Sequence, residues 1–307
     1  MSTYTKEKTE VNYRKALKRV CHMAYKKSLI AGFDGNLSLK IDNDKFLFTP
    51  SNSHKGLLEE EDFVLVNNAG EIIEETDKRP SSDLHIHLEA YKKRPDIGAF
   101  IHAHPQTVVA LTLCGVDFNQ PAIPNVIVSL GEVQSVKYTS PEREIELKQT
   151  INCLEKSNIV ILEKHGAVTI GKDIFDAFYK MELLEHASKV IFYASSIGEL
   201  KHLEPELVDL LVKERHRIYG KEVELREGIK LFQSSKNTFN LKNIFKKAFS
   251  GNSPVFQRML SLSNELILNT LSHTDYSKKL TKEEKENLAK ELTASFFDLL
   301  LGRFVKK

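Results

Sequence analysis

Residues 98–113 read GAFIHAHPQTVVALTL, and this stretch decides the fold class that we expect. Gly98–Ala103 is a short apolar run that ends shortly before a proline, which is typical of a buried strand. Pro105 suits the first turn of a helix, and we expect that helix to run to Leu113. A buried strand followed at once by a helix indicates a layered domain of mixed α and β structure.

The alternation of strands and helices continues on both sides of this stretch. Apolar residues recur at helical spacing in some segments and alternate with polar residues in others. We expect further helices over 8–31, 80–94, 142–155 and 173–198, and further strands over 37–41, 46–49, 63–66, 71–74, 126–129, 133–138, 159–162 and 167–170. In the helix over 80–94, Ser81 or Ser82 is expected to cap the N-terminus.

The composition changes near residue 200. The chain has 307 residues and a net charge of +2, but residues 201–307 hold 20 Lys and Arg against 14 Asp and Glu. Helical spacing returns over Glu283–Phe304. We therefore predict a main domain at 1–200 and a basic, helical C-terminal extension at 201–307.

The basic segment Lys230–Arg258 also contains five phenylalanines. Such a segment could bind nucleic acid or a membrane surface. The alternative, which we favour, is a solvated helix face that packs its phenylalanines on the main domain.

Charge, hydropathy and cysteine usage exclude several classes of protein. A net charge of +2 gives no field that favours nucleic acid, and no apolar run approaches the roughly 18 residues of a membrane span. Cys21, Cys114 and Cys153 are scattered and form no CxxC pair, which favours a reducing compartment. The polar N-terminus contains no signal peptide pattern. We expect a cytoplasmic protein with neither membrane nor nucleic acid as a partner.

Two histidines end the strand at 98–103. Residues two apart on a strand point to one face, so His102 and His104 are expected to direct both imidazoles to one spot. Neutral imidazoles are good zinc ligands. The motif alone leaves a pair of core or surface histidines as an alternative.

A third histidine follows the apolar strand over 159–162. His165 lies at a strand-to-turn junction, beside Gly166, which permits a tight turn. A catalytic zinc site has three protein ligands and one open position. Spacing does not show whether His165 lies near His102, so a loop histidine without a role stays an alternative.

The start of the helix over 80–94 is a second candidate site. Ser81 and Ser82 offer hydroxyls beside free helix N–H groups, and this combination binds anions. Asp83 could contact a metal or move a proton. Helix capping alone is the simpler interpretation. His87 lies one turn after Asp83 and could support it, whereas His85 points elsewhere on the helix.

Taken together, five segments resemble the class II aldolase/adducin family. These are G-N-L-S at 35–38, T-P-S-N at 49–52, R-P-S-S-D at 79–83, H-A-H-P at 102–105 and K-H-G-A-V at 164–168. The resemblance covers about residues 10–200. It implies a three-layer α/β/α sandwich around a central, mostly antiparallel sheet, and a homotetramer with active sites between subunits.

The resemblance also implies the role of each matching residue. The metal ligands are His102, His104 and His165, the metal is zinc or another divalent transition metal, and position 83 is the catalytic acid/base. The implied phosphate pocket is made of Gly35, Asn36, Ser51, Asn52, Ser81 and Ser82. Two departures bear on the substrate. Asp83 stands where the family aldolases usually have glutamate, and Asn52 stands where they commonly have glycine.

The function expected from this motif set is that of a zinc-dependent lyase. An aldolase of this type cleaves a ketose phosphate to dihydroxyacetone phosphate and an aldehyde through a metal-stabilised enediolate. Three alternatives use the same metal site on a related sugar phosphate: a dehydratase, an epimerase or a decarboxylase. A non-catalytic, adducin-like interaction protein is the alternative from a different class.

Overall fold

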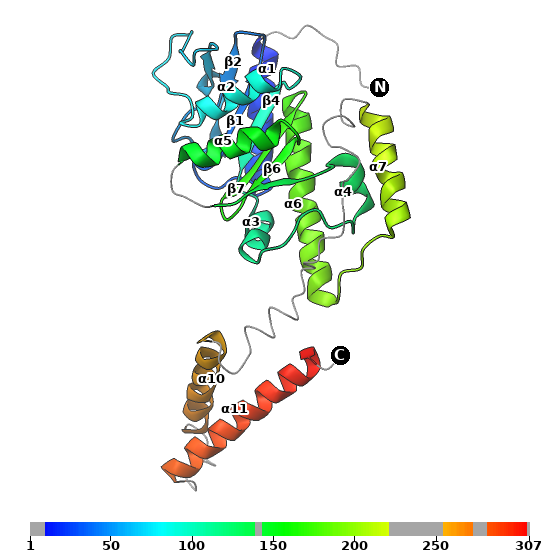
Figure 1. Ribbon diagram of the computed structural model, residues 1–307. Coiled ribbons are helices and arrows are strands. Elements are labelled where there is room, and N and C mark those ends of the chain that lie inside the picture. The colour runs from blue at the N-terminus through cyan, green and yellow to red at the C-terminus, as the bar shows by residue number, and fades with distance from the viewer. Residues whose placement is uncertain (1–9, 139–142, 221–253, 273–280, 306–307) are drawn as a thin grey trace. The chain divides into compact units, whose positions relative to one another are not determined.

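The computed structural model describes residues 10–138, 143–220, 254–272 and 281–305. They belong to two compact units, Met1–Phe239 and Asn240–Lys307. Figure 1 shows the elements of both.

The first unit is built on a seven-stranded sheet. Its strands lie in the order β3-β2-β1-β4-β7-β6-β5. The pair β5–β6 is parallel, and the other five pairs are antiparallel. The strands are β1 Asn36–Lys40, β2 Phe46–Phe48, β3 Val64–Val66, β4 Ala99–Ala103, β5 Gln134–Val136, β6 Ile159–Leu162 and β7 Gly166–Gly171. The stretch that decided the fold class therefore supplies β4, the central strand.

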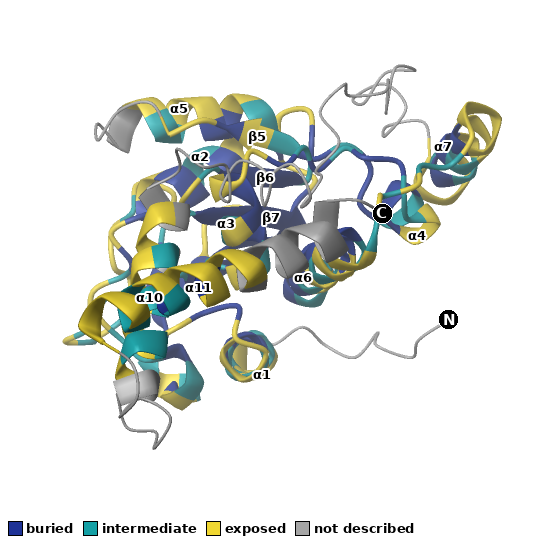
Figure 2. Ribbon diagram, turned by 90° about the horizontal axis from the view of Figure 1, so that it is seen from below, coloured by how far each residue is buried: buried dark blue, intermediate teal, exposed yellow. Residues whose placement is uncertain are grey.

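Helices cover both faces of this sheet. The described helices of this unit are α1 Glu10–Lys26, α2 Leu84–Lys93, α3 Gln106–Leu113, α4 Pro124–Ser129, α5 Arg143–Leu154, α6 Ile174–Ile197 and α7 Pro205–Tyr219, with short 3₁₀ turns at Lys55–Leu57 and Glu60–Asp62. Figure 2 shows α2 and α5 on one side of the sheet and α1 and α6 on the other, with buried residues between the layers. The predicted α/β/α sandwich around a mostly antiparallel sheet is confirmed.

The layer of α2 and α5 matters most for the site. Leu84 and Ile86 of α2, and Ile151 and Leu154 of α5, join one apolar cluster with Phe100 of β4. Burial of such side chains stabilises the layer by roughly 1.5–3 kcal/mol each. Because side chains alternate along a strand, His102 points to the same face as Phe100 and so lies below α2 and α5.

Three local predictions were wrong. The strand expected over 126–129 is the helix α4, which begins at Pro124 and packs Ile127 on α7. The strand expected over 71–74 is reduced to a single bridge at Ile72, because the Glu74 carboxylate accepts the Leu65 N–H at 2.6 Å.

The third error concerns the start of α2. The N-cap of α2 is Asp83 and not a serine, but the Ser81 hydroxyl does accept the Asp83 N–H at 3.2 Å, directly before the helix. Pro80 forms a bridge with Pro50, and the Ser81 N–H donates to the Thr49 carbonyl at 3.2 Å. The backbone is therefore paired before residue 83, and the helix starts later than the serines predict.

The described part of the second unit consists of two helices that pack on each other, α10 Pro254–Ser272 and α11 Lys282–Val305. The helix predicted over Glu283–Phe304 is confirmed as α11. Most of the basic segment Lys230–Arg258 lies outside the described residues. None of the described helices is long and apolar enough to cross a membrane. The domain roles assigned to 1–200 and 201–307 stay a prediction.

Candidate metal centre

The first two histidines are held by the central strand. His102 is a residue of β4 and pairs with Asn36 of β1 and Val168 of β7. His104 follows the strand, and its N–H donates to the Leu29 carbonyl at 2.9 Å. The backbones of both residues are therefore fixed by hydrogen bonds to neighbouring segments.

The third histidine lies in the hairpin that joins β6 to β7. Leu162 and Gly166 face each other across this turn, and the His165 N–H donates to the Leu162 carbonyl at 3.0 Å. Lys164 adopts a φ of 65°, which turns the chain sharply. A Cβ at Gly166 would lie 2.4 Å from the Ala103 carbonyl oxygen, so only glycine lets the hairpin approach β4 this closely.

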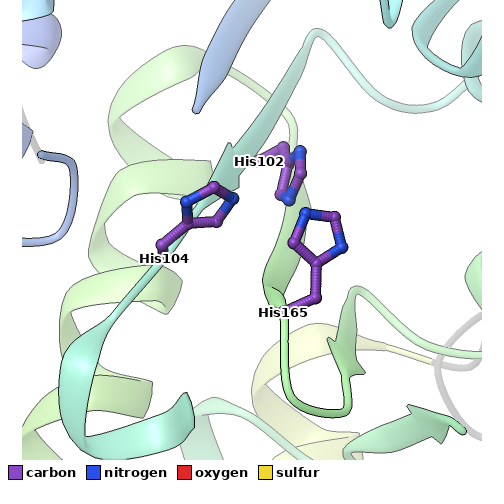
Figure 3. A group of neighbouring side chains, drawn as sticks. All are labelled: His102, His104 and His165. Atoms are coloured by element: carbon purple, nitrogen blue, oxygen red, sulfur yellow. The ribbon is translucent and has the colours of Figure 1, made fainter. Parts of the chain in front are cut away.

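These two segments bring the three imidazoles together, as Figure 3 shows. The ring centroids lie 5.0 Å apart for His102–His104, 4.9 Å for His102–His165 and 5.1 Å for His104–His165. One nitrogen from each ring lies within 4.8 Å of the other two. The alternative in which His165 is a remote loop residue is excluded.

The donor set fits a divalent transition metal. The Nε2 atoms of His102 and His104 are buried and have no hydrogen-bond partner within the described chain. Burial lowers the pKa of both rings to about 4, and for His104 the neighbouring histidines add to that effect. The rings are therefore neutral near pH 7, which is the form that binds metal. Three imidazoles leave a fourth position for a substrate.

The second nitrogen of each ring lies near a carboxylate. Nδ1 of His102 lies 3.6 Å from Asp83, Nδ1 of His104 lies 3.4 Å from Asp34, and Nδ1 of His165 lies 3.2 Å from Glu146. Metal-binding histidines commonly donate their other N–H to such a partner. This pattern leaves Nε2 of each ring as the nitrogen available to a metal ion.

A chain of buried hydrogen bonds leads from Asp83 into the core. Asn36 Nδ2 donates to Asp83 Oδ2 at 2.7 Å, and His87 Nε2 lies 2.7 Å from Asn36 Oδ1. His87 Nδ1 lies 2.7 Å from the Ser38 hydroxyl, which lies 2.8 Å from the Tyr91 hydroxyl. His87 thus supports Asp83 as expected, but indirectly: it bonds Asn36, and Asn36 bonds Asp83.

The direction of these bonds follows from their partners. Asn36 donates with its amide nitrogen, so its oxygen must accept the proton on His87 Nε2. Burial lowers the pKa of His87 well below its usual 6.5, so the ring is neutral and its Nδ1 accepts from Ser38. In each of these hydrogen bonds the donor is therefore the group farther from Asp83, and Asp83 Oδ2 accepts the last one.

The residues predicted to bind phosphate lie on three neighbouring segments. The Ser51 N–H donates to the Arg79 carbonyl, which ties the turn at 49–52 to the segment that contains Ser81 and Ser82. A Cβ at Gly35 would lie 2.8 Å from the His102 carbonyl oxygen, so the first turn also adjoins the metal ligands. Ser82 and Asn52 are exposed, Ser51 is half-buried and Ser81 is buried.

Asn36 is placed differently from the others. It is buried, with 6% of its surface exposed, and both ends of its amide bond Asp83 and His87. Its side chain therefore orients the Asp83 carboxylate in this structure. Its assignment to phosphate stays a prediction, as do those of the other pocket residues.

Lys55 joins the first two turns. Its Nζ donates to the Phe33 carbonyl at 2.7 Å and to the Ser53 carbonyl at 3.0 Å. Only 2% of Lys55 is exposed, and burial lowers its pKa. When protonated, this buried ammonium adds positive charge beside the predicted phosphate turns.

Sequence reasoning missed Asp34, Glu146 and Lys55. Asp34 stands next to a quoted motif and could have been found by its position. Glu146 is one of 42 acidic residues and lies 19 positions before His165, so no pattern in the sequence marks it. Only the packing of α5 on the sheet brings it to the histidines.

Comparison with known proteins agrees with this geometry. Residues 15–192 match the class II aldolase and adducin N-terminal domain family, which is more than half of the chain. The chain belongs to this family. Residues 193–307 lie beyond the match.

Two curated members of the family and one solved structure are similar to the chain. The L-fuculose phosphate aldolase of Methanococcus vannielii is 33% identical over 172 residues, which cover 56% of this chain and 91% of that protein. The 3-oxo-tetronate 4-phosphate decarboxylase of Haemophilus influenzae is 28% identical over 188 residues, 60% of this chain and 89% of that protein. The crystal structure of YgbL from Escherichia coli aligns with a TM-score of 0.61 at 26% identity, over 66% of this chain and 99% of that one.

Proposed function

We propose that this member of the class II aldolase family is a zinc-dependent lyase that cleaves a carbon–carbon bond of a phosphorylated sugar. The observation that carries the proposal is the convergence of three imidazoles, two of them with buried Nε2 atoms that lack a partner, beside the oriented carboxylate of Asp83. A purely structural site would have satisfied these buried nitrogens within the protein. The same observation disfavours the adducin-like alternative.

His102, His104 and His165 would hold the ion. When bound, zinc would act as a Lewis acid that stabilises the negative charge developing on a substrate oxygen. Cobalt, nickel or iron would also suit three imidazoles.

Asp83 would move the proton of the reaction. When the carbon–carbon bond breaks, its electron pair stays on the carbon next to the carbonyl, and that carbon must then gain a proton. In aldol cleavage, the Asp83 carboxylate would carry a proton between the hydroxyl that becomes the aldehyde carbonyl and this carbon. The hydrogen bond from Asn36 fixes one carboxylate oxygen and so fixes the position of the other.

The turns around Gly35, Ser51 and Ser81 would bind the phosphate through N–H groups and hydroxyls. Lys55 supports two of these turns, so its charge would add to the attraction. Binding the phosphate away from the reacting carbons would orient the substrate. The predicted homotetramer remains part of the proposal.

Two reactions fit this arrangement. Aldol cleavage is favoured by the relative named L-fuculose phosphate aldolase, and decarboxylation by the relative named 3-oxo-tetronate 4-phosphate decarboxylase. Both leave a carbanion next to a carbonyl. They differ in the leaving fragment, which is an aldehyde in one case and carbon dioxide in the other.

The test compares two histidine variants. His102→Ala removes a ligand, and His85→Ala removes an exposed histidine of α2 as a matched control. We expect the purified His102→Ala protein to lose bound zinc and all activity on a panel of ketose 1-phosphates and 3-oxo acid 4-phosphates, while His85→Ala keeps both. Product analysis of aldehyde against carbon dioxide separates the two reactions. Full metal content and activity in His102→Ala would refute the proposal.

A further inference from the structure

We infer that Glu146 is a positioning residue of the metal centre, which holds the His165 ring in the orientation that binds the ion. The inference rests on the proposed metal function and extends it to a residue of α5. Glu146 Oε1 lies 3.2 Å from His165 Nδ1, and the Glu146 side chain is only 16% exposed.

His165 needs such support more than the other two ligands. The side chains of His102 and His104 are 9% and 24% exposed, whereas the His165 side chain lies on a hairpin turn and is 37% exposed. Side chains on turns lose more conformational freedom when a ligand fixes them. A partner that orders the ring in advance removes part of that entropy loss from metal binding.

Glu146 is in turn fixed by its helix. Ile151 and Leu154 anchor α5 in the apolar cluster on the sheet face to which His102 points. The carboxylate thus reaches His165 from a buried layer. A proton donated by Nδ1 to Glu146 leaves the lone pair on Nε2, so the same contact selects both the orientation and the tautomer of the ring.

Glu146 also shares a small cavity with the other groups of the site. A cavity of about 20 Å³ is lined by Asp83, Glu146, His102 and His165, with apolar residues around them. Because a cavity this small admits little water, the hydrogen bond between Glu146 and His165 is stronger than it would be in solvent.

Asp34 offers an internal comparison. It lies 3.4 Å from His104 Nδ1, but its side chain is 62% exposed. Exposed pairs of this kind contribute little. We therefore expect Asp34→Asn to change zinc affinity less than Glu146→Gln does.

The experiment measures the zinc affinity of the full chain by competition with a chromophoric chelator. Glu146→Ala should weaken zinc binding by about 10- to 100-fold, the usual effect of losing such a partner. Glu146→Gln should weaken it less, because the amide oxygen still accepts the Nδ1 proton. Glu163→Gln is the control, since it removes the same charge two residues from His165 on a side chain that lines a separate cavity of about 610 Å³. It should stay within about twofold of the wild type.

Hydrogen exchange gives a readout that a general loss of charge would not change. In the wild type, zinc should slow exchange both in the 163–166 hairpin and over 145–150 of α5. In Glu146→Ala the hairpin should still respond, but α5 should not. If Glu146→Ala does not fold, Glu146→Met decides by the same two measurements, because its side chain has a similar volume but cannot accept the Nδ1 proton.

Two outcomes would overturn the inference. Zinc affinity in a folded Glu146→Ala equal to that of the wild type would refute the role of Glu146 and leave the metal site intact. A wild-type protein that binds none of zinc, cobalt and nickel would refute the metal function and this inference together.

Discussion

The close approach of Gly166 to β4 leads to a specific prediction for Gly166→Ala. An added Cβ would lie 2.4 Å from the Ala103 carbonyl oxygen and 2.6 Å from Cδ2 of His104. Such contacts do not fall below 3.0 Å in real proteins, so the backbone contact alone requires a shift of at least 0.6 Å, the difference between 3.0 and 2.4 Å. The atoms that must move belong to the residues beside His104 and His165.

That shift is large for a metal site, where ligand distances hold to within about 0.2 Å. We expect Gly166→Ala to weaken zinc binding by at least about 10-fold. Overpacking should also reduce the free energy of unfolding by roughly 1–3 kcal/mol. Both quantities can be measured on the same protein, by chelator competition and by urea unfolding of the metal-free form.

Gly98→Ala provides the control at the other end of the same strand pair. Its Cβ would lie 2.3 Å from the Lys172 carbonyl oxygen, which is a comparable clash. Gly98 lies four positions before His102, about 13 Å along the strand at 3.3 Å per residue. It should lose similar stability and keep its zinc affinity. If Gly166→Ala binds zinc as tightly as Gly98→Ala does, the close approach does not position the ligands and the reasoning fails.

Three further predictions follow from the buried polar groups. Asp83→Asn should reduce turnover by about 100-fold or more with zinc content unchanged, because it removes the proton acceptor; unchanged turnover would exclude Asp83 as the acid/base. His87→Phe keeps the contact with Phe100 but removes the partner of Asn36 Oδ1 and one of the two partners of the Ser38 hydroxyl, so urea unfolding should show a loss of about 1–3 kcal/mol, and an unaltered stability would contradict the chain of bonds. In the metal-free protein, the free energy of unfolding should fall as the pH drops from 6.5 toward 4. Burial keeps His87 and His102 neutral in the folded state, so the unfolded state binds more protons in that range; a flat profile between pH 7 and pH 4.5 would contradict this.

Much of the fold could be predicted because hydrophobic spacing reflects layers directly. Gly98–Ala103 is buried on both faces and became β4, and Glu283–Phe304 carries helical spacing and became α11. The Val-Ile-Val run at 126–128 was misassigned as a strand. Its β-branched residues favour strands, but Pro124 begins a helix there and packing on α7 stabilises it.

The candidate site was also predicted only in part from the sequence. Three histidines could be named because two share a strand face and the third adjoins a glycine turn. Their convergence, and the carboxylates behind them, depend on strand order and on how α5 lies over the sheet. Asn36 illustrates the limit: its position was predicted, but its partners became visible only in the packed core.

The three histidines proposed to hold the metal lie on β4, directly after it and in the hairpin beside it, whereas the segments proposed to hold the phosphate are chain reversals at the ends of strands. Substitutions in such reversals disturb a sheet far less than substitutions inside it. Selection could therefore change how a substrate is held by its phosphate while leaving the three histidines where they are. That separation of chemistry from recognition would let a single scaffold diversify, in keeping with a family whose members are named for both an aldolase and a decarboxylase.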